Sequence, residues 1–208
     1  MTQHKTGLGS RGERDIQRRL HTEPMAARFY DSQVLDHLNG RMREFVARQE
    51  MLFMATADAN GECDSTFRAG PPGFVQVLDE RTLAFPEYRG NGVMASLGNI
   101  TENPHVGLLM IDFLRDLVGL HVNGTAEVIE DAVLRRGHPL PEPDIPGREA
   151  NLWVRVMVVE AYIHCAKHIP RLAKLPRARM WGTDDATRKK SDYFGAAGCG
   201  DPADRANQ

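Results

Sequence analysis

The chain has 208 residues, which suits one domain with flanking tails, and its 41% hydrophobic residues can build one substantial core. A formal net charge of −2 argues against a protein that binds nucleic acid through an overall basic field. No apolar run reaches the length of a transmembrane helix, the first residues lack the pattern of a secretion signal, and three scattered cysteines predict no disulfide framework. We therefore expect a cytoplasmic protein with no membrane partner.

The first 24 residues are polar and predict an arm that precedes the domain. This arm is rich in basic residues, which could contact nucleic acid, but its composition favours a solvated or partly disordered tail. We therefore expect no nucleic-acid partner. A helix is predicted over residues 32–48, with Asp31 or Ser32 as its cap, because six apolar residues fall on one helical face: Val34, Leu35, Leu38, Met42, Phe45 and Val46.

Hairpin-linked strands are predicted to follow this helix, because short apolar or alternating runs are separated by turn residues. Asn60-Gly61 supplies the positive φ angles that a tight turn between the first two strands needs. Further along, apolar side chains alternate with polar ones such as His121 and Asn123, which is typical of a strand with one buried face. The predicted strands cover residues 51–57, 62–68, 74–78, 82–85, 106–111, 117–129 and 152–162, and short helices are expected over 131–136 and 164–169.

Six or seven antiparallel strands with helices at the start, middle and end predict a mainly β protein with flanking helices, an α+β architecture. The sequence shows no βαβ alternation, which argues against a doubly wound parallel sheet. A closed or nearly closed antiparallel barrel fits the pattern best. We expect this barrel to occupy residues 25–182 and a polar tail to occupy residues 183–208.

The stretch from Phe85 to Pro104 carries the main functional signal. Gly90, Asn91 and Gly92 precede a short predicted helix, and such a turn can bring backbone N–H groups and the positive end of a helix dipole to an anion. Arg89 can add a bidentate contact to phosphate. We expect a phosphate cradle for flavin mononucleotide (FMN), although turns of this composition also serve as plain connections. Four apolar residues fall at helical spacing in this stretch: Val93, Met94, Leu97 and Ile100.

Several phrases occur in an order that is similar to the pyridoxamine-phosphate-oxidase-like superfamily, the FMN-binding split barrels. They are TADANG followed by RAGPPGFV, then YRGN and SLGNITENPHVGLL, then LHVNGTAEVIED, and finally AYIHCAK. Together they resemble a bacterial subgroup of FMN-dependent enzymes, and the likeness extends from about Phe45 to Trp181. The resemblance implies a split barrel that forms a homodimer, with two flavins held at the subunit interface.

Carried onto this chain, the resemblance also implies a set of flavin-binding positions. Contacts to the flavin are expected from Arg68, Ala69, Gly70, Phe85 and Pro86. Contacts to the phosphate are expected from Arg89, Gly90, Asn91 and Ser96, with Asn99 nearby. The partner subunit is expected to contribute His121, Asn123, His164 and Lys167.

The chain departs from the vitamin-producing oxidases of this superfamily at Ala95 and Ser96, where they carry an Arg-Lys pair. Their C-terminal substrate motif is also not recognisable, so the resemblance implies an FMN-dependent oxidoreductase that acts on another small organic substrate. The flavin ring carries the redox chemistry, and no catalytic side chain is assigned. The alternatives are a flavin-binding protein without turnover and a split barrel that binds deazaflavin or haem, the latter through His164 or His168. No metal-ion site is predicted, because Pro170 ends any helix that would carry this histidine pair.

Overall fold

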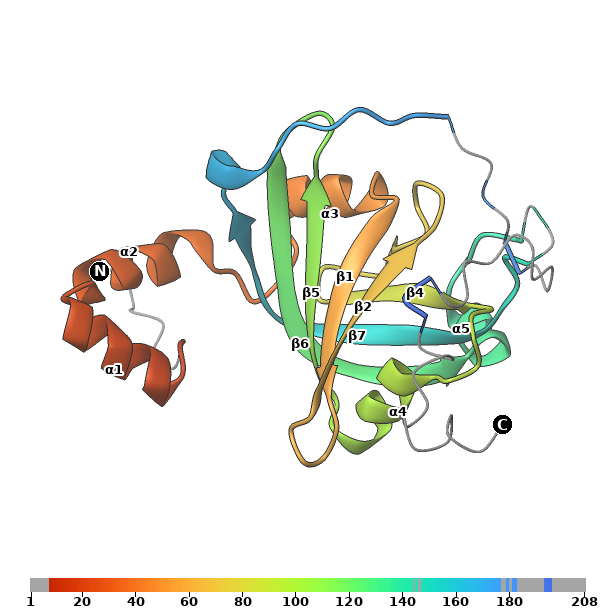
Figure 1. Cartoon of the computed structure of the whole chain (residues 1–208), viewed down its shortest axis with the longest axis horizontal. Helices are drawn as coiled ribbons and strands as arrows, with labels where there is room; N and C mark the ends of the chain where they lie inside the picture. The colour runs from red at the N-terminus through yellow and green to blue at the C-terminus, as the bar shows by residue number, and fades with distance from the viewer. Residues whose placement is uncertain are drawn as a thin grey trace, which may run out of the picture.

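Seven antiparallel strands form one curved sheet in the order β2-β1-β5-β6-β7-β4-β3 (Figure 1). The computed structural model describes residues 8–143, 145, 147–176, 179, 181–182 and 193–195. Among the described strands, β2 and β3 stand at the two ends of this order, so the sheet curls into a barrel that is split between them. The strands are β1 (Met51–Ala57), β2 (Cys63–Ala69), β3 (Gln76–Val77), β4 (Thr82–Tyr88), β5 (His105–Asp112), β6 (Val118–Glu130) and β7 (Ala150–His164).

The predicted α+β split barrel is therefore confirmed, and the core lies inside the curled sheet. Fully buried side chains from β1, β5 and β6, such as Met54, Met110 and Val122, pack together there. Alternation along β6 is also as predicted, because Val122 and Ala126 are buried while His121 and Asn123 face outward and are partly exposed. The Asn60-Gly61 turn joins β1 to β2, with Gly61 at a φ of 84°. Strand β3 is shorter than predicted.

The prediction of a single helix over residues 32–48 is wrong. The structure instead has α2 (Glu23–Gln33) and α3 (Gly40–Ala47), separated by extended chain in which Leu35 exchanges both backbone hydrogen bonds with Ala161. This pairing has a physical reason: β4 pairs with β7 only as far as Met157, so Ala161 needs another partner at that edge. Asn39 then starts α3 by accepting a hydrogen bond from the Met42 amide. Four of the six apolar residues that were assigned to one helical face are nonetheless buried, namely Val34, Leu38, Phe45 and Val46.

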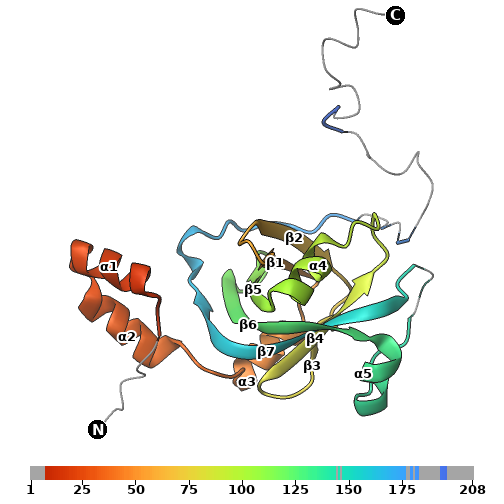
Figure 2. The same cartoon turned by 90° about the horizontal axis from the view of Figure 1, so that it is seen from below.

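The N-terminal arm is helical rather than a disordered tail in its described part. Helix α1 (Arg11–Leu20) begins with a capping box in which Ser10 and Glu13 exchange hydrogen bonds. Helices α1 and α2 form a hairpin that stands to the side of the barrel in both views (Figures 1 and 2). The Phe29 ring of α2 meets the Tyr162 ring of β7 edge-on at 5.9 Å. The predicted C-terminal tail lies outside the described residues except for 193–195.

The remaining helices cover the barrel. Helix α4 (Ala95–Glu102) packs against β1, β2 and β6, and α5 (Asp131–Gly137) lies against β6 and β7 (Figure 2). The segment after β7 contains one 3₁₀ turn, η1 (Ala166–His168), where a longer helix was predicted. No described helix has both the length and the apolar character needed to span a bilayer.

Candidate functional site

A cleft of about 210 Å³ opens where β2 and the end of β4 approach the loop that leads into α4. Side chains of β2 reach it at every second position, as expected for residues on one face of a strand. Only Arg68, Gly90, Asn91 and Ser96 among the predicted cofactor-binding residues line this cleft. Among the residues that the structure describes, the lining consists of Asp64, Thr66, Arg68, Glu87 and residues 90–96.

An ion pair lies at this cleft. Arg68 donates from Nη1 to Oε1 of Glu87 across 2.9 Å, and the two side chains are 21% and 8% exposed. Burial raises the pKa of the Glu87 carboxyl, and the nearby Arg68 charge opposes that shift. Nε of Arg68 and Oε2 of Glu87 are also buried, and neither has a hydrogen-bond partner in the described part of the chain. One donor and one acceptor therefore remain to be satisfied at this ion pair.

The start of α4 forms the other wall of the cleft. Met94 precedes the helix with a φ of 56°, and no side chain of the described residues caps the first turn. Asn91 accepts a hydrogen bond from the Val93 amide at 3.0 Å, which shapes the loop. The uncapped first turn therefore presents backbone donors and the positive end of the helix dipole. Ser96 Oγ donates its hydroxyl hydrogen to the Asp64 carboxylate across 2.6 Å, so this hydrogen is already engaged within the chain.

Two apolar positions in this loop differ from the predicted pattern. Val93 and Met94 were expected on the apolar face of the helix, but both precede it and are 71% and 45% exposed. Leu97 and Ile100 are buried as expected. The helix therefore begins later than the spacing suggested.

Arg89 stands outside the residues that line the cleft. Its Nη1 donates to the backbone carbonyl of Gly182 across 3.2 Å, and the ring of neighbouring Tyr88 meets Trp181 edge-on at 5.3 Å. The end of β4 is therefore in contact with a segment almost 100 residues further along the chain. A contact between Arg89 and phosphate stays a prediction.

Other predicted positions have structural partners. Asn99 donates from Nδ2 to the Thr56 hydroxyl across 3.1 Å. A Cβ added at Gly70 would lie 2.3 Å from Cβ of Phe74, so this glycine makes room for that aromatic ring. Ala69 ends β2, and Phe85 is fully buried in the core.

The residues expected from a partner subunit gather elsewhere, near the paired ends of β6 and β7. Nε2 of His121 lies 3.1 Å from Nδ1 of His164, and the His121 ring stacks on Tyr162 with centroids 4.7 Å apart. Burial, with the His164 charge adding to it, lowers the pKa of His121. Asn123 lies on the same strand, and Lys167 is exposed in η1. None of these residues lines the cleft of the same chain.

The cleft also contains residues that the sequence interpretation missed. Asp64 and Glu87 contribute two carboxylates, and together with Arg68 they give the described part of the lining a net charge of −1. Side chains two residues apart on a strand share a face, so counting back from Arg68 along β2 would have identified Asp64. Glu87 is the one charged residue of strand β4. Within the described residues, no group of three or more histidine, cysteine or acidic side chains is placed to hold a metal ion.

Comparisons with known proteins address the family. Residues 38–165 match the family model described as pyridoxamine 5'-phosphate oxidase. No curated protein matches the sequence significantly. The solved structures that resemble it include a protein of the pyridoxinephosphate oxidase family from Clostridium acetobutylicum, with 13% identity over 64% of this chain and 89% of that one, at a TM-score of 0.43.

Two other solved structures carry different names. One is the heme storage protein HutZ from Vibrio cholerae, with 14% identity, coverage of 61% of this chain and 93% of that one, and a TM-score of 0.39. The other is an F420 reductase, with 21% identity, coverage of 59% and 94%, and a TM-score of 0.38. At such scores these likenesses assign no cofactor to this chain.

Proposed function

The chain belongs to the pyridoxamine 5'-phosphate oxidase family, and on this premise we propose that it is an FMN-dependent oxidoreductase that acts on a small organic substrate. The flavin supplies the electron or hydride transfer when it is bound. The residues of the chain bind and orient it and exclude water from it. We further propose that the protein works as a homodimer.

The observation that carries this proposal is the unsatisfied polar pair in the cleft. Nε of Arg68 needs an acceptor and Oε2 of Glu87 needs a donor, and both atoms are buried. A phosphate on a hydroxyl-bearing ribityl chain offers both kinds of group. The first turn of α4 adds backbone donors for the phosphate. These residues therefore fit FMN in the kind of groups they provide.

The carboxylates of the cleft decide how strongly a phosphate would bind. Asp64 and Glu87 oppose a dianion, while Arg68 and the helix dipole attract it. The raised pKa of Glu87 means that this carboxyl takes up a proton more readily than an exposed glutamate does. We propose that Glu87 orients Arg68 and shares its second oxygen with a ligand hydroxyl. Arg89 is the second cation that we propose for the phosphate.

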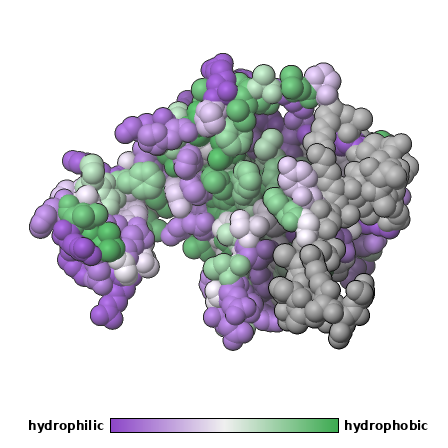
Figure 3. Space-filling view, in the orientation of Figure 1, coloured by the Kyte–Doolittle hydropathy of each residue, from purple (hydrophilic) through white to green (hydrophobic). Residues whose placement is uncertain are grey.

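The outer face of the sheet is the surface that we propose for binding a second copy of the chain. Register pairs align Phe67, Phe53, Leu109, His121 and Tyr162 in one row across five strands. Phe67 and Phe53 are 54% and 37% exposed, and hydrophobic side chains gather over the middle of this face in Figure 3. An exposed apolar sheet face of this kind is typical of a protein interface. A partner seated here is the proposed route by which His121 and Asn123 would reach a flavin.

The test is anaerobic reduction of the FMN-loaded protein by a reduced nicotinamide, followed by exposure to oxygen. An oxidoreductase loses the visible band of oxidised flavin, regains it with oxygen and repeats the cycle over many turnovers. A protein that binds FMN and is not reduced is a flavin carrier. A protein that ignores FMN and instead gives the Soret band of added haem, or binds a deazaflavin, contradicts the proposal.

A further inference from the structure

We propose that the helical hairpin of α1 and α2 docks on a second copy of the chain, in a hollow on the outer face of its sheet. Both helices lie outside residues 38–165, the part that matches the family model. The proposal rests on the proposed homodimer, but it does not depend on FMN. It gives the N-terminal arm a role in the subunit interface.

The hairpin has no hydrophobic core of its own. Helix α1 has 10 residues and α2 has 11, all of them described, and no residue of either helix is buried. Polar contacts join the two helices, because the Tyr30 hydroxyl donates to Glu13 and accepts a hydrogen bond from Gln17 at 2.7 Å. Helices shorter than about 12–15 residues are marginal in water without tertiary packing. The hairpin therefore needs an apolar surface to pack against.

One side of the hairpin is apolar. The helices contact each other through Gln17 and Tyr30, and in each helix a hydrophobic residue comes directly before this contact residue. A second hydrophobic residue lies four positions away on the same helical face. Because the helices run antiparallel, both pairs turn to the same side of the hairpin. These four side chains are 36–63% exposed, and they belong to Ile16, Leu20, Met25 and Phe29.

This apolar side continues the outer face of the sheet. Phe29 meets the Tyr162 ring edge-on at 5.9 Å, and Tyr162 ends the row of residues that crosses five strands from Phe67. Figure 3 shows hydrophobic side chains on the hairpin and on the sheet from the same viewpoint. A second copy that is seated on the sheet would therefore face the hairpin as well.

A hollow of about 490 Å³ lies next to this row on the outer face. Ala55, Ala57 and Gly107 line it where β1 pairs with β5. Ala55 is two residues from Phe53 on β1, and Gly107 is two residues from Leu109 on β5, so they share the face of the row. Small side chains at this place leave room for the larger side chains of another molecule.

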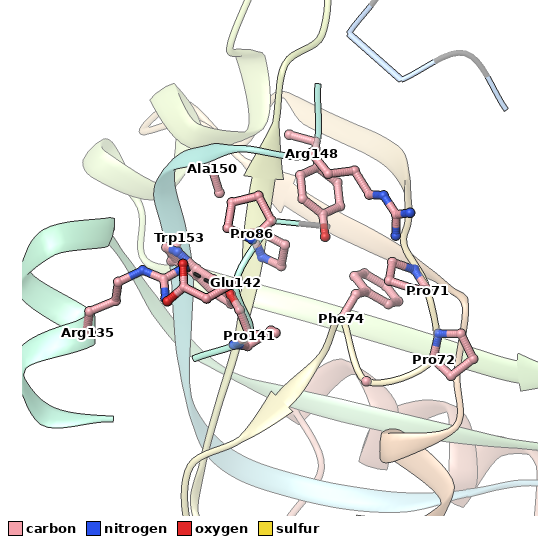
Figure 4. A pocket seen from close by; sticks show the side chains of 13 residues that line it. Pro71, Pro72, Phe74, Pro86, Arg135, Pro141, Glu142, Arg148, Ala150 and Trp153 are labelled. Atoms are coloured by element: carbon pink, nitrogen blue, oxygen red, sulfur yellow. Dashed lines mark hydrogen bonds and ion pairs between the residues drawn. The ribbon is translucent and has the colours of Figure 1, made fainter. Parts of the chain in front are cut away.

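The hollow suits a protein partner rather than a small molecule. The pocket of about 330 Å³ beside α5 is walled by the rings of Phe74, Pro86 and Trp153 (Figure 4). The hollow instead opens on the outside of the sheet, and Val159 of its lining is 57% exposed. Small-molecule sites enclose most of the ligand surface, whereas open apolar faces are typical of protein interfaces.

The same patch carries a protrusion and a depression, which is what a twofold dimer requires. In such a dimer the same surface of both subunits meets, so each copy must supply what the other receives. The hairpin supplies exposed hydrophobic side chains, and the hollow supplies the room. Leu35 and Ala161 exchange backbone hydrogen bonds of 3.0 and 2.8 Å, which hold the hairpin at the side of its own barrel (Figures 1 and 2). Two hairpins would therefore fill two hollows in one dimer.

The test is crosslinking of the full chain through the exposed thiol of Cys63, which lines the hollow. The other cysteines, Cys165 and Cys199, are replaced by serine, and Ile16→Cys adds a thiol on the apolar side of α1. A short bis-maleimide should then join the hairpin of one copy to the hollow of the other, as a covalent dimer whose linked peptides are identified by mass spectrometry. Arg18→Cys is the matched control, because it is exposed on the opposite side of the same helix and should crosslink much less.

Two further variants measure the contact itself. Met25→Glu places a charge in the proposed apolar contact, so we expect the dimer to dissociate at least about tenfold more readily in sedimentation. Ala55→Leu fills the hollow and should reduce the crosslink between Cys63 and the thiol of Ile16→Cys. Arg18→Gln, on the other side of α1, should leave the dimer unchanged.

Three outcomes would overturn the proposal. A dimer in which Ile16→Cys and Arg18→Cys crosslink to Cys63 equally, or not at all, would remove the hairpin from the interface and leave the homodimer intact. A crosslink confined to one monomer would mean that the hairpin covers its own hollow. A protein that is monomeric at every concentration would contradict the docking as well as the dimer. Reduction and reoxidation of FMN are measured separately, so the oxidoreductase and the docked hairpin fail independently.

Discussion

Arg68 and Glu87 form a 2.9 Å ion pair across the split of the barrel, linking β2 at one end of the sheet order to β4 near the other. Removing two charges from water is costly, and each side chain keeps one buried polar atom that lacks a partner in the described part of the chain. A pair of this kind adds little to stability by itself. Its value is that it holds a cation and an acceptor ready beside the uncapped start of α4.

The first prediction concerns Arg68→Gln. Loss of the cation should weaken FMN binding by about 10- to 150-fold, the range for a charged hydrogen bond worth about 1.5–3 kcal/mol. The variant should also be less stable by about 3 kcal/mol, because Glu87 is left as a buried charge. Flavin-fluorescence titration and urea unfolding measure the two effects. Arg81→Gln, which removes an exposed contact to Asp36, is the control that should leave FMN affinity unchanged.

The second prediction concerns Glu87→Gln and pH. Burial raises the pKa of Glu87 in the native state, so the native protein binds this proton more tightly than the unfolded chain does. The resulting contribution to stability is complete below the unfolded value of about 4.3 and is lost as pH rises through the native value. Glu87→Gln should lack this pH-dependent contribution to the free energy of unfolding. Chemical unfolding measured across the acidic range checks this prediction. If the free energy of unfolding varies with pH in the same way in the wild-type protein and in Glu87→Gln, the assignment to Glu87 is contradicted.

The same variant predicts a change in ligand affinity. Deprotonation of Glu87 places a negative charge near the proposed phosphate, so wild-type FMN affinity should fall as pH rises, apart from the ionisation of the phosphate itself. Glu87→Gln should bind FMN more tightly above that transition. An FMN affinity that falls in the variant at every pH would mean that orienting Arg68 matters more than the repulsion.

The third prediction concerns His121. Burial lowers its pKa in the native state, so the unfolded chain binds this proton more readily. Its contribution to stability is therefore present above the unfolded value of about 6.5 and is lost as pH falls through the native value. His121→Gln should flatten the stability profile between about pH 5 and 7.5. Chemical unfolding measured across this pH range checks the prediction, and an unchanged dependence of the free energy of unfolding on pH in the variant would contradict it.

The fourth prediction concerns the outer face of the sheet. Phe53 and Phe67 have ring centroids 5.6 Å apart, and both side chains are partly exposed. Phe67→Glu should turn a dimer into a monomer, because a charge at the centre of an apolar interface is left without a partner. Sedimentation measures this change. Leu175→Glu, at an 80% exposed position, is the control. A wild-type protein that is monomeric at every concentration would contradict the proposed dimer.

Local pattern predicted much of the barrel. The Asn60-Gly61 turn and the alternation along β6 follow from backbone geometry within a few residues, so the sequence reveals them. The interruption of the predicted helix at Leu35 could not be inferred from local pattern, because it depends on an edge of β7 that exists only in the folded sheet. The same limit applies to Glu87, whose meeting with Arg68 depends on how the barrel curls. Family resemblance indicated the loop at residues 90–92, but not the acids that face it.

The most direct measurement compares the affinities of FMN and riboflavin by isothermal titration. The two ligands differ only in the phosphate, so the comparison isolates the contact that the cleft is proposed to make. The account predicts that FMN binds at least about tenfold more tightly and that this advantage becomes smaller in Arg68→Gln, which leaves Arg89 and the start of α4 in place. Equal affinity for the two ligands, or no binding of either, would contradict it.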